Sequence, residues 1–231
     1  MTDENIVYTI AIWLIPLVFA IVFHEVAHGW VARAFGDPTA AGLGRLTLNP
    51  IKHVDPVGTV ILPMVLAIAN APIFGWAKPV PVVAERLRNP RVHMMLVALA
   101  GPASNFALAI LTAATLAMAL TISGPPQGDV QRFVYDNLWN FLLINVFLGT
   151  FNLIPLPPFD GGHIVEGLLP RSALPAWHRI AQFGFPLLIV LLLVLPALLP
   201  EANIVARVIG PLARAITEAI IGVFGLSFGT R

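Results

Sequence analysis

The sequence predicts an all-α polytopic membrane protein: a bundle of about four to six transmembrane helices with a small membrane-associated β-hairpin or re-entrant segment. The chain has 231 residues, of which 58% are hydrophobic and only 11% are charged. Its mean hydropathy is +0.85, so it carries more apolar surface than a soluble domain of this size can bury. The net charge of +1, with no basic cluster interleaved with aromatic residues, argues against nucleic-acid binding.

The first predicted span, Val7–Ala32, carries the most informative motif of the chain. His24 and His28 are four residues apart, so on a helix both face one side and can bind one ion, with Glu25 beside them. Unpaired ionisable groups are costly in a membrane, and a zinc ion would remove that cost. The alternative is a chance match, or two histidines bonded to neighbouring helices. Arg33 follows, which places the N-terminus outside and the histidines toward the cytoplasm.

Three further apolar stretches follow in the central part of the chain. Residues 57–76 are interrupted by prolines and flanked on both sides by basic residues, which favours a segment that enters the membrane and returns. Residues 92–122 are long and rich in Ala and Leu, and predict a helix that runs outward. Residues 138–156 return inward and end in a run of prolines that no regular helix accommodates.

The C-terminal part predicts one more span and one helix of undecided placement. Residues 180–199 are apolar and follow two arginines, consistent with a cytoplasmic start. Residues 204–228 carry a polar stripe, so they form either a last span or a helix on the membrane surface. At the other end, the acidic start of the chain argues against a cleaved signal peptide.

A zinc site of this kind needs a third protein ligand and leaves the fourth position for water. The chain has no cysteine, so histidine and carboxylate must supply the ligands. Asp160 is the strongest candidate, because it follows proline-broken backbone and precedes two glycines at a cytoplasmic helix end. The alternative is a loop aspartate in a turn. His163, Asp55 and His53 are the other candidate ligands.

Three motifs resemble the site-2 protease family of intramembrane zinc metalloproteases, over nearly the whole chain. They are His24-Glu25-Val26-Ala27-His28, Ala100-Gly101-Pro102-Ala103-Ser104-Asn105 and the run from Asn152 to Gly162. Residues 49–59 and 75–82 further resemble the compact subgroup, which lacks PDZ and CBS domains. The resemblance implies a single metalloprotease domain over residues 1–231 that holds one Zn²⁺ through His24, His28 and Asp160. Glu25 would be the base that acts on zinc-activated water.

The resemblance also implies a function and further site residues. The expected activity is hydrolysis of peptide bonds within or near transmembrane segments of membrane-protein substrates, in the cell membrane, with the active site toward the cytoplasm. Asn152 aligns with an asparagine beside the family's active site, so it is expected either to donate to the oxyanion or to bond another helix. His53 is a second candidate donor. Asn105 and Asn145 are interpreted as interhelical hydrogen-bonding residues.

Residues 42–48 alternate in part and predict a strand near the end of the first helix, with an ordinary connecting loop as the alternative. Together with the resemblance, they predict a hairpin whose free edge captures an extended substrate and exposes its scissile amide. The residues expected to bind substrate are Gly44, Arg45, Leu46, His53 and Asn105.

Two other functions compete with proteolysis. A metal-ion transporter also places histidine and carboxylate in a membrane, but such folds often contain internal repeats, and the sequence shows none. A catalytically inactive membrane chaperone is disfavoured because Glu25 and both histidines are intact. The sequence leaves open the identity of the substrate, its regulation and whether the chain forms a homo-oligomer.

Overall fold

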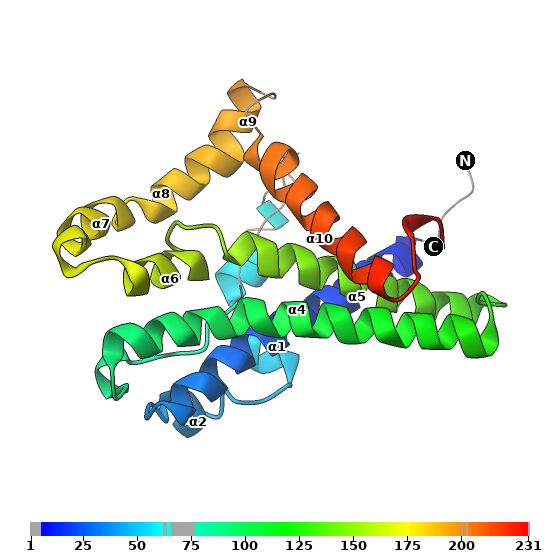
Figure 1. The fold of residues 1–231 in the computed structure, drawn as a ribbon, viewed down its shortest axis with the longest axis horizontal. Coiled ribbons are helices and arrows are strands. Elements are labelled where there is room, and N and C mark those ends of the chain that lie inside the picture. The colour runs from blue at the N-terminus through cyan, green and yellow to red at the C-terminus, as the bar shows by residue number, and fades with distance from the viewer. Residues whose placement is uncertain (1–5, 62–63, 66–76, 200, 202, 231) are drawn as a thin grey trace.

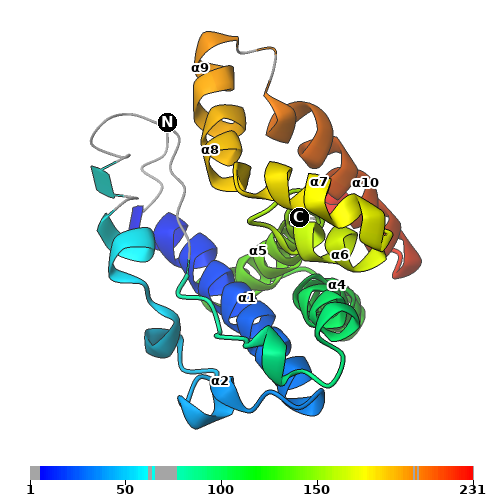
Figure 2. The same cartoon turned by 90° about the vertical axis from the view of Figure 1, so that its left-hand side faces the viewer.

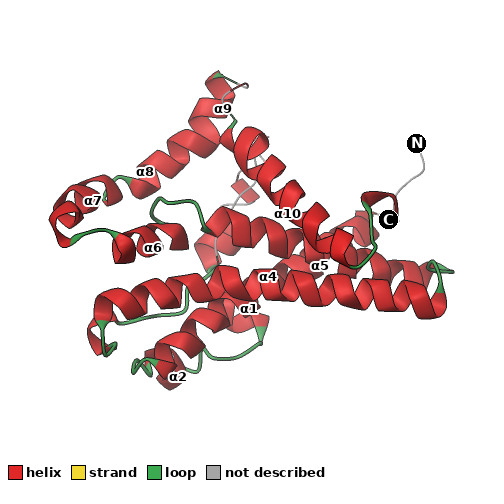
Figure 3. Ribbon diagram, in the orientation of Figure 1, coloured by secondary structure: helices red, strands yellow, loops and turns green. Residues whose placement is uncertain are grey.

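The computed structural model describes residues 6–61, 64–65, 77–199, 201 and 203–230. Helices and connecting loops make up this part, and none of these residues forms a β-strand (Figure 3). Three long helices form the centre of the molecule: α1 (Ile6–Ala34), α4 (Pro90–Ser123) and α5 (Asp129–Asn152) pack against one another (Figure 1). The helical class predicted from the sequence is confirmed.

Two of the described helices, α1 and α4, are long and apolar enough to cross a membrane. Both continue through an internal proline, Pro16 in α1 and Pro102 in α4. Large apolar side chains cover their outer surfaces: Ile6 is 71% exposed and Ile122 is 75% exposed. Because water disfavours such surfaces and lipid does not, these two helices have the length and the surface of membrane spans, as the sequence predicted.

The third long helix, α5, differs from its prediction at both ends. It begins at Asp129 and ends at Asn152, whereas the apolar pattern indicated residues 138–156. The helix stops before Pro155 because proline cannot continue the backbone hydrogen-bond ladder. α5 also carries buried amides that bond its neighbours, such as Asn140, whose Nδ2 donates to the Ile12 carbonyl at 2.8 Å. Trp139 and Leu142 of α5 pack with Leu116 of α4 in the main core.

The chain after α5 turns back on the bundle as shorter helices. α6 (Asp160–Leu168) packs on α4 (Figure 2) and leads to α7 (Leu174–Ala181). α8 (Gly184–Ile189), a π-helical turn and α9 (Leu195–Leu198) follow, and α10 (Gly210–Val223) packs against α5 and α4. The span expected over 180–199 is thus the second part of a bent pair: the axes of 171–181 and 184–198 differ by 58°. If this pair is one span, the described part contains three.

The strand expected over residues 42–48 does not form. Helix α2 (Thr39–Gly42) ends in a turn in which Gly44 adopts φ +63°, the left-handed region that glycine tolerates. The Gly44 and Arg45 amides bond back to the Ala41 and Ala40 carbonyls at 3.0 and 2.9 Å, so these residues close a helix end instead of pairing with a strand. The segment expected to re-enter, 57–76, lies mostly outside the described residues.

A buried carboxylate ties the loop after α1 to the chain before α4. Asp37 is fully buried, and its two oxygens accept hydrogen bonds from the Thr39 amide at 3.0 Å and the Val83 amide at 2.7 Å. The Thr39 hydroxyl also donates to Asp37, and Arg86 donates to that hydroxyl at 2.7 Å. This network holds the segment 77–83 beside the second half of α1, where the histidines lie.

Candidate metal centre

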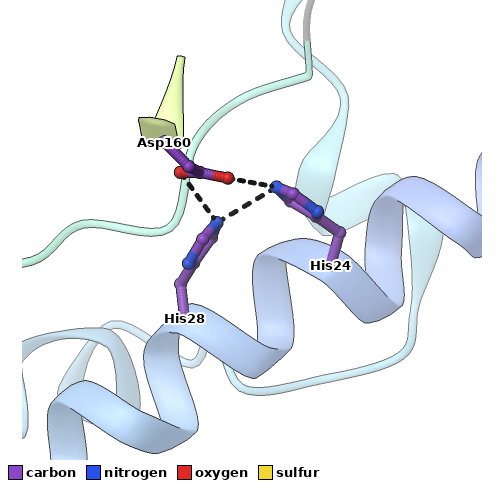
Figure 4. Close-up of side chains that lie close together, drawn as sticks. All are labelled: His24, His28 and Asp160. Carbon is purple, nitrogen blue, oxygen red and sulfur yellow. Dashed lines mark hydrogen bonds and ion pairs between the residues drawn. The ribbon is translucent and has the colours of Figure 1, made fainter. Parts of the chain in front are cut away.

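The histidines of α1 and the aspartate that begins α6 converge on one point (Figure 4). The Nε2 atoms of His24 and His28 are 3.1 Å apart. Asp160 places Oδ2 3.1 Å from His24 Nε2 and Oδ1 3.4 Å from His28 Nε2. Both histidines are buried, with 7% and 9% of their surface exposed. Helix spacing therefore brings His24 and His28 together as predicted, and the fold adds Asp160.

The other ring nitrogen of each histidine faces an oxygen that accepts hydrogen bonds. His28 Nδ1 lies 2.7 Å from the Val97 carbonyl, and His24 Nδ1 lies 2.6 Å from Asn105 Oδ1. Since an oxygen of either kind can only accept, each Nδ1 carries the hydrogen. A neutral imidazole then has a bare lone pair at Nε2. Such partners are typical of metal-binding histidines.

Three acceptors thus point at one another with no hydrogen between them. Asp160 Oδ2 is buried and has no hydrogen-bond partner, which is costly unless a cation lies there. His24 Nε2 lies 3.1 Å from both His28 Nε2 and Asp160 Oδ2, close to the tetrahedral edge of about 3.4 Å for metal–ligand bonds of ~2.1 Å, and one ligand atom from each of the three residues lies within 4.8 Å of the others. Two imidazoles and one carboxylate form a common ligand set of catalytic zinc. The residues present fit a zinc ion.

Helix α4 supports both histidines from one stripe of its surface. Val97, Gly101 and Asn105 are spaced by four residues, as are His24 and His28, and so share one helix face. Gly101 lies between the two hydrogen-bonding positions. A Cβ built on Gly101 would lie 2.5 Å from Cε1 of His24 and from Cε1 and Nε2 of His28. Only glycine therefore permits this approach of α4 to α1.

The start of α6 delivers the carboxylate. Asp160 is its first residue, where a negative charge is favoured by the unpaired amides and the helix dipole. Two residues later, Gly162 packs tightly on the preceding loop, because a Cβ built on it would lie 2.7 Å from the Pro157 nitrogen. At the other end of α6, Arg91 of α4 donates to the Glu166 carbonyl at 3.3 Å and to the Leu169 carbonyl. Helix α4 thus anchors α6 as well as the histidines.

Glu25 is half-buried and bound to the segment 77–83. Its Oε2 accepts a hydrogen bond from the Val80 amide at 2.6 Å. Val80 lies between two prolines, which have no N–H, so it is the one donor of the Pro79–Pro81 stretch. Arg45 donates to the Lys78 carbonyl at 2.7 Å and so helps to hold this stretch in place. The Val80 amide holds one carboxylate oxygen of Glu25, so the direction of the second oxygen is fixed as well, and that oxygen has no bond to Val80.

The other residues that the sequence suggested as ligands, oxyanion donors or substrate contacts do not belong to the group formed by His24, His28 and Asp160. Asn152 donates from Nδ2 to Leu148 of its own helix at 3.0 Å. His53 is buried and bonds the Thr47 carbonyl through Nε2 at 2.9 Å, while Leu46 lies against Gly29 of α1. Among the alternative ligands, Asp55 accepts from the Gly58 amide at 2.6 Å, and His163 lies 3.7 Å from Glu166. The metal-competent group found in the described chain contains His24, His28 and Asp160.

Some functional contacts were not predicted from the sequence. The Val80 amide, the Val97 carbonyl and the bond from Asn105 to His24 were all missed. A backbone group carries no sequence signal of its own. The four-residue spacing of Val97, Gly101 and Asn105, which matches the histidine spacing on an antiparallel neighbour, was a usable signal.

Comparisons with known proteins agree with this centre. Residues 12–135 and 119–195 match the model of peptidase family M50. A Bacillus subtilis (strain 168) protein named "Putative zinc metalloprotease YwhC" is 35% identical over 219 residues, which cover 93% of this chain and 91% of the relative. "Putative zinc metalloprotease Rip2" of Mycolicibacterium smegmatis is 32% identical over 194 residues, 83% of this chain and 68% of the relative. No solved structure gives a significant match. The chain belongs to peptidase family M50, the zinc metalloproteases of the site-2 protease group.

Proposed function

We propose that the chain hydrolyses peptide bonds within or near the transmembrane segments of membrane-protein substrates, with one Zn²⁺ held by His24, His28 and Asp160. The observation that carries the proposal is that Nε2 of His24, Nε2 of His28 and the Asp160 carboxylate converge at 3.1 to 3.4 Å beside the apolar helix α1. A Methanocaldococcus jannaschii protein named "Zinc metalloprotease MJ0392" is 25% identical over 185 residues, which cover 79% of this chain and 42% of the relative.

The residues of the chain divide the chemistry between them. Zinc in this centre supplies a Lewis acid, which makes water a nucleophile near neutral pH. Glu25, directly beside His24, takes the proton of the attacking water through the oxygen that Val80 leaves free. It then returns the proton to the leaving amine, which breaks the peptide bond. Asn152 has a second N–H beyond the one bonded to Leu148, and we assign it to the oxyanion of the substrate.

The loop after α2 is proposed to receive the substrate. Gly44, Arg45 and Leu46 lie next to the stretch that holds Glu25, since Arg45 bonds the Lys78 carbonyl and Leu46 lies against Gly29, one turn after Glu25. His53 fixes this loop through Thr47. A substrate segment that unwinds against this loop would lose its intrahelical hydrogen bonds and present a carbonyl to the centre. Asn105 is assigned to His24 rather than to direct substrate contact.

The proposed topology places the centre toward the cytoplasm of the cell membrane. Residues 1–231 form one domain of four to six membrane helices, in which the α4 N-terminus is cytoplasmic and its C-terminus is outside. Because the chain has no cysteine, single cysteines report on sidedness without background. Glu85, before the α4 N-terminus, and Ser123, at its C-terminus, are both exposed, so each can be replaced by a reactive cysteine. A membrane-impermeant thiol reagent added to intact cells should label only Ser123→Cys; labelling of Glu85→Cys instead would reverse the orientation.

The decisive experiment compares two variants in detergent with a single-span substrate. Glu25→Gln should bind zinc at wild-type stoichiometry and cleave nothing, because it keeps the ligands and loses the base. Asp160→Ala should lose bound zinc and cleavage together. A chelator should inactivate the wild type, and added zinc should restore cleavage. Cleavage by Glu25→Gln, or zinc uptake into proteoliposomes without any cleavage, would refute the proposal.

A further inference from the structure

We infer that Asn145 is a positioning residue of the metal centre: through Asn105 it fixes the tautomer and orientation of His24. The inference rests on the proposed zinc site and deepens it. Asn145 lies on α5, and its side chain forms hydrogen bonds with Asn105 and with the Phe141 carbonyl. It acts through a chain of hydrogen bonds that crosses from α5 to α4 and then to α1.

The direction of this chain is determined from one end. The Phe141 carbonyl can only accept, so the Asn145 amide nitrogen donates to it, at 2.8 Å. Asn145 therefore turns its oxygen toward Asn105 and accepts from Asn105 Nδ2, at 2.8 Å. Asn105 is left with its oxygen toward His24, 2.6 Å from Nδ1. The hydrogen of His24 must then sit on Nδ1, and the lone pair on Nε2 faces the metal position.

Burial makes this direction hard to reverse. Asn105 and Asn145 are both 0% exposed. If either amide rotated by half a turn, two NH₂ groups or two oxygens would face each other with no water to separate them. The network thus excludes the tautomer that places a hydrogen on Nε2, which would point into the centre and oppose zinc.

Asn105 Nδ2 has a second hydrogen-bond acceptor, so its orientation does not depend on Asn145 alone. The Ala20 carbonyl of α1 lies 3.4 Å from Asn105 Nδ2 and also draws that nitrogen. At 3.4 Å this bond is much weaker than the 2.8 Å bond to Asn145. Loss of Asn145 should therefore weaken the control of the tautomer, whereas loss of Asn105 should remove it. The expected effects are graded in that order.

The competing explanation is that Asn145 only holds helices together, and Asn140 provides the matched control. Asn140 lies on the same helix, is also 0% exposed, and donates to α1 through the Ile12 carbonyl at 2.8 Å. Asn140→Leu and Asn145→Leu each remove one buried amide from α5. If interhelical bonding were the whole role, both variants would affect the centre alike.

The test uses the full chain in detergent and measures two properties other than cleavage. Zinc affinity is measured by chelator competition, and ¹⁵N NMR of histidine-labelled, zinc-free protein at about pH 8 reports the tautomer of His24, assigned with a His24→Gln variant. Asn145→Leu should raise the zinc dissociation constant about tenfold, as expected when a group that orients a metal ligand is lost, and populate the Nε2–H tautomer of His24. Asn140→Leu should change neither. Asn145→Asp should restore both, because an aspartate oxygen at this position still accepts the hydrogen bond from Asn105 Nδ2.

The outcomes separate the inference from the proposed function. If Asn145→Leu keeps wild-type zinc affinity and the Nδ1–H tautomer, the Ala20 carbonyl suffices and the inference is wrong. If Asn140→Leu weakens zinc binding as much as Asn145→Leu, the effect is general packing and the inference is also wrong. Failure of the wild type to bind zinc would overturn the proposed function, whereas the tautomer measurement would still decide the role of Asn145.

Discussion

Gly101→Ala tests whether α4 shapes the metal centre by its close approach. The added methyl group would lie 2.5 Å from one atom of His24 and from two atoms of His28, in the stripe that also bonds both rings. Ordinary contacts between such atoms are about 3.5 to 4.0 Å. The imidazoles must therefore move by about 1 Å, or α4 must move away and lengthen the bonds from Val97 and Asn105.

The expected cost follows from this overlap. Overpacking a buried site by one methyl group typically costs about 1 to 3 kcal/mol. Because the overlap is with the ligands themselves, most of this cost should oppose the geometry that binds zinc. It corresponds to a zinc dissociation constant raised by a factor of about 5 to 150. The global fold should be affected less, since the same methyl group improves helix propensity by about 0.5 to 1 kcal/mol.

The assay is zinc affinity by chelator competition, beside the thermal midpoint of the zinc-free protein. Gly222→Ala is the matched control, because it lies in helix α10 and its Cβ would meet no atom within 4 Å. That variant should bind zinc as the wild type does and be equally or more stable. Wild-type zinc affinity in Gly101→Ala would mean that the rings have room to move, and the argument from close approach would fail.

Three further predictions concern the neighbourhood of the centre. Val80→Pro removes the amide that holds Glu25 and should lower kcat about tenfold or more with unchanged zinc content, measured by steady-state cleavage and metal analysis. Val97→Ala should lower the thermal midpoint but keep the zinc affinity, because the bond to His28 comes from its carbonyl. Burial opposes ionisation of Asp37, yet hydrogen bonds from Thr39 and Val83 hold its pKa below the ordinary value. The stability that the Asp37 carboxylate gives the fold is therefore complete above about pH 4 and is lost as the pH falls through its lowered pKa in the folded state. The thermal midpoint of the wild type should exceed that of Asp37→Asn above about pH 4, and this difference should shrink as the pH falls below it.

The sequence predicted the grouping of His24, His28 and Asp160 better than the architecture around it. His24 and His28 are adjacent through helix spacing alone, and Asp160 was the strongest remaining carboxylate. Helices α1 and α4 were predicted because their apolar runs are long. The start of α5 was missed, since the polar residues after Asp129 hide a helix that the core and the buried amides stabilise. Propensity and hydropathy do not report such tertiary contacts.

Two other differences arise from backbone geometry. The strand over residues 42–48 was predicted from partial alternation, but the left-handed turn at Gly44 closes α2 and uses the amides that a strand would have paired. The break before α8 lies where Gly184 approaches the Pro157 carbonyl so closely that a Cβ would collide with it. That contact joins residues far apart in sequence, and no local pattern contains it.

The two histidines are supported by different kinds of acceptor, and this difference determines which positions of α4 are chemically constrained. His28 bonds the carbonyl of residue 97, which every amino acid supplies, so position 97 is constrained by packing alone. His24 bonds the side chain of Asn105, whose oxygen is aimed by Asn145, so its tautomer depends on two buried amides. Position 101, between them, must remain small. The Gly-Pro-x-x-Asn motif is thus explained by antiparallel packing against His24 and His28: one residue makes room for the ligands, and the other bonds one of them.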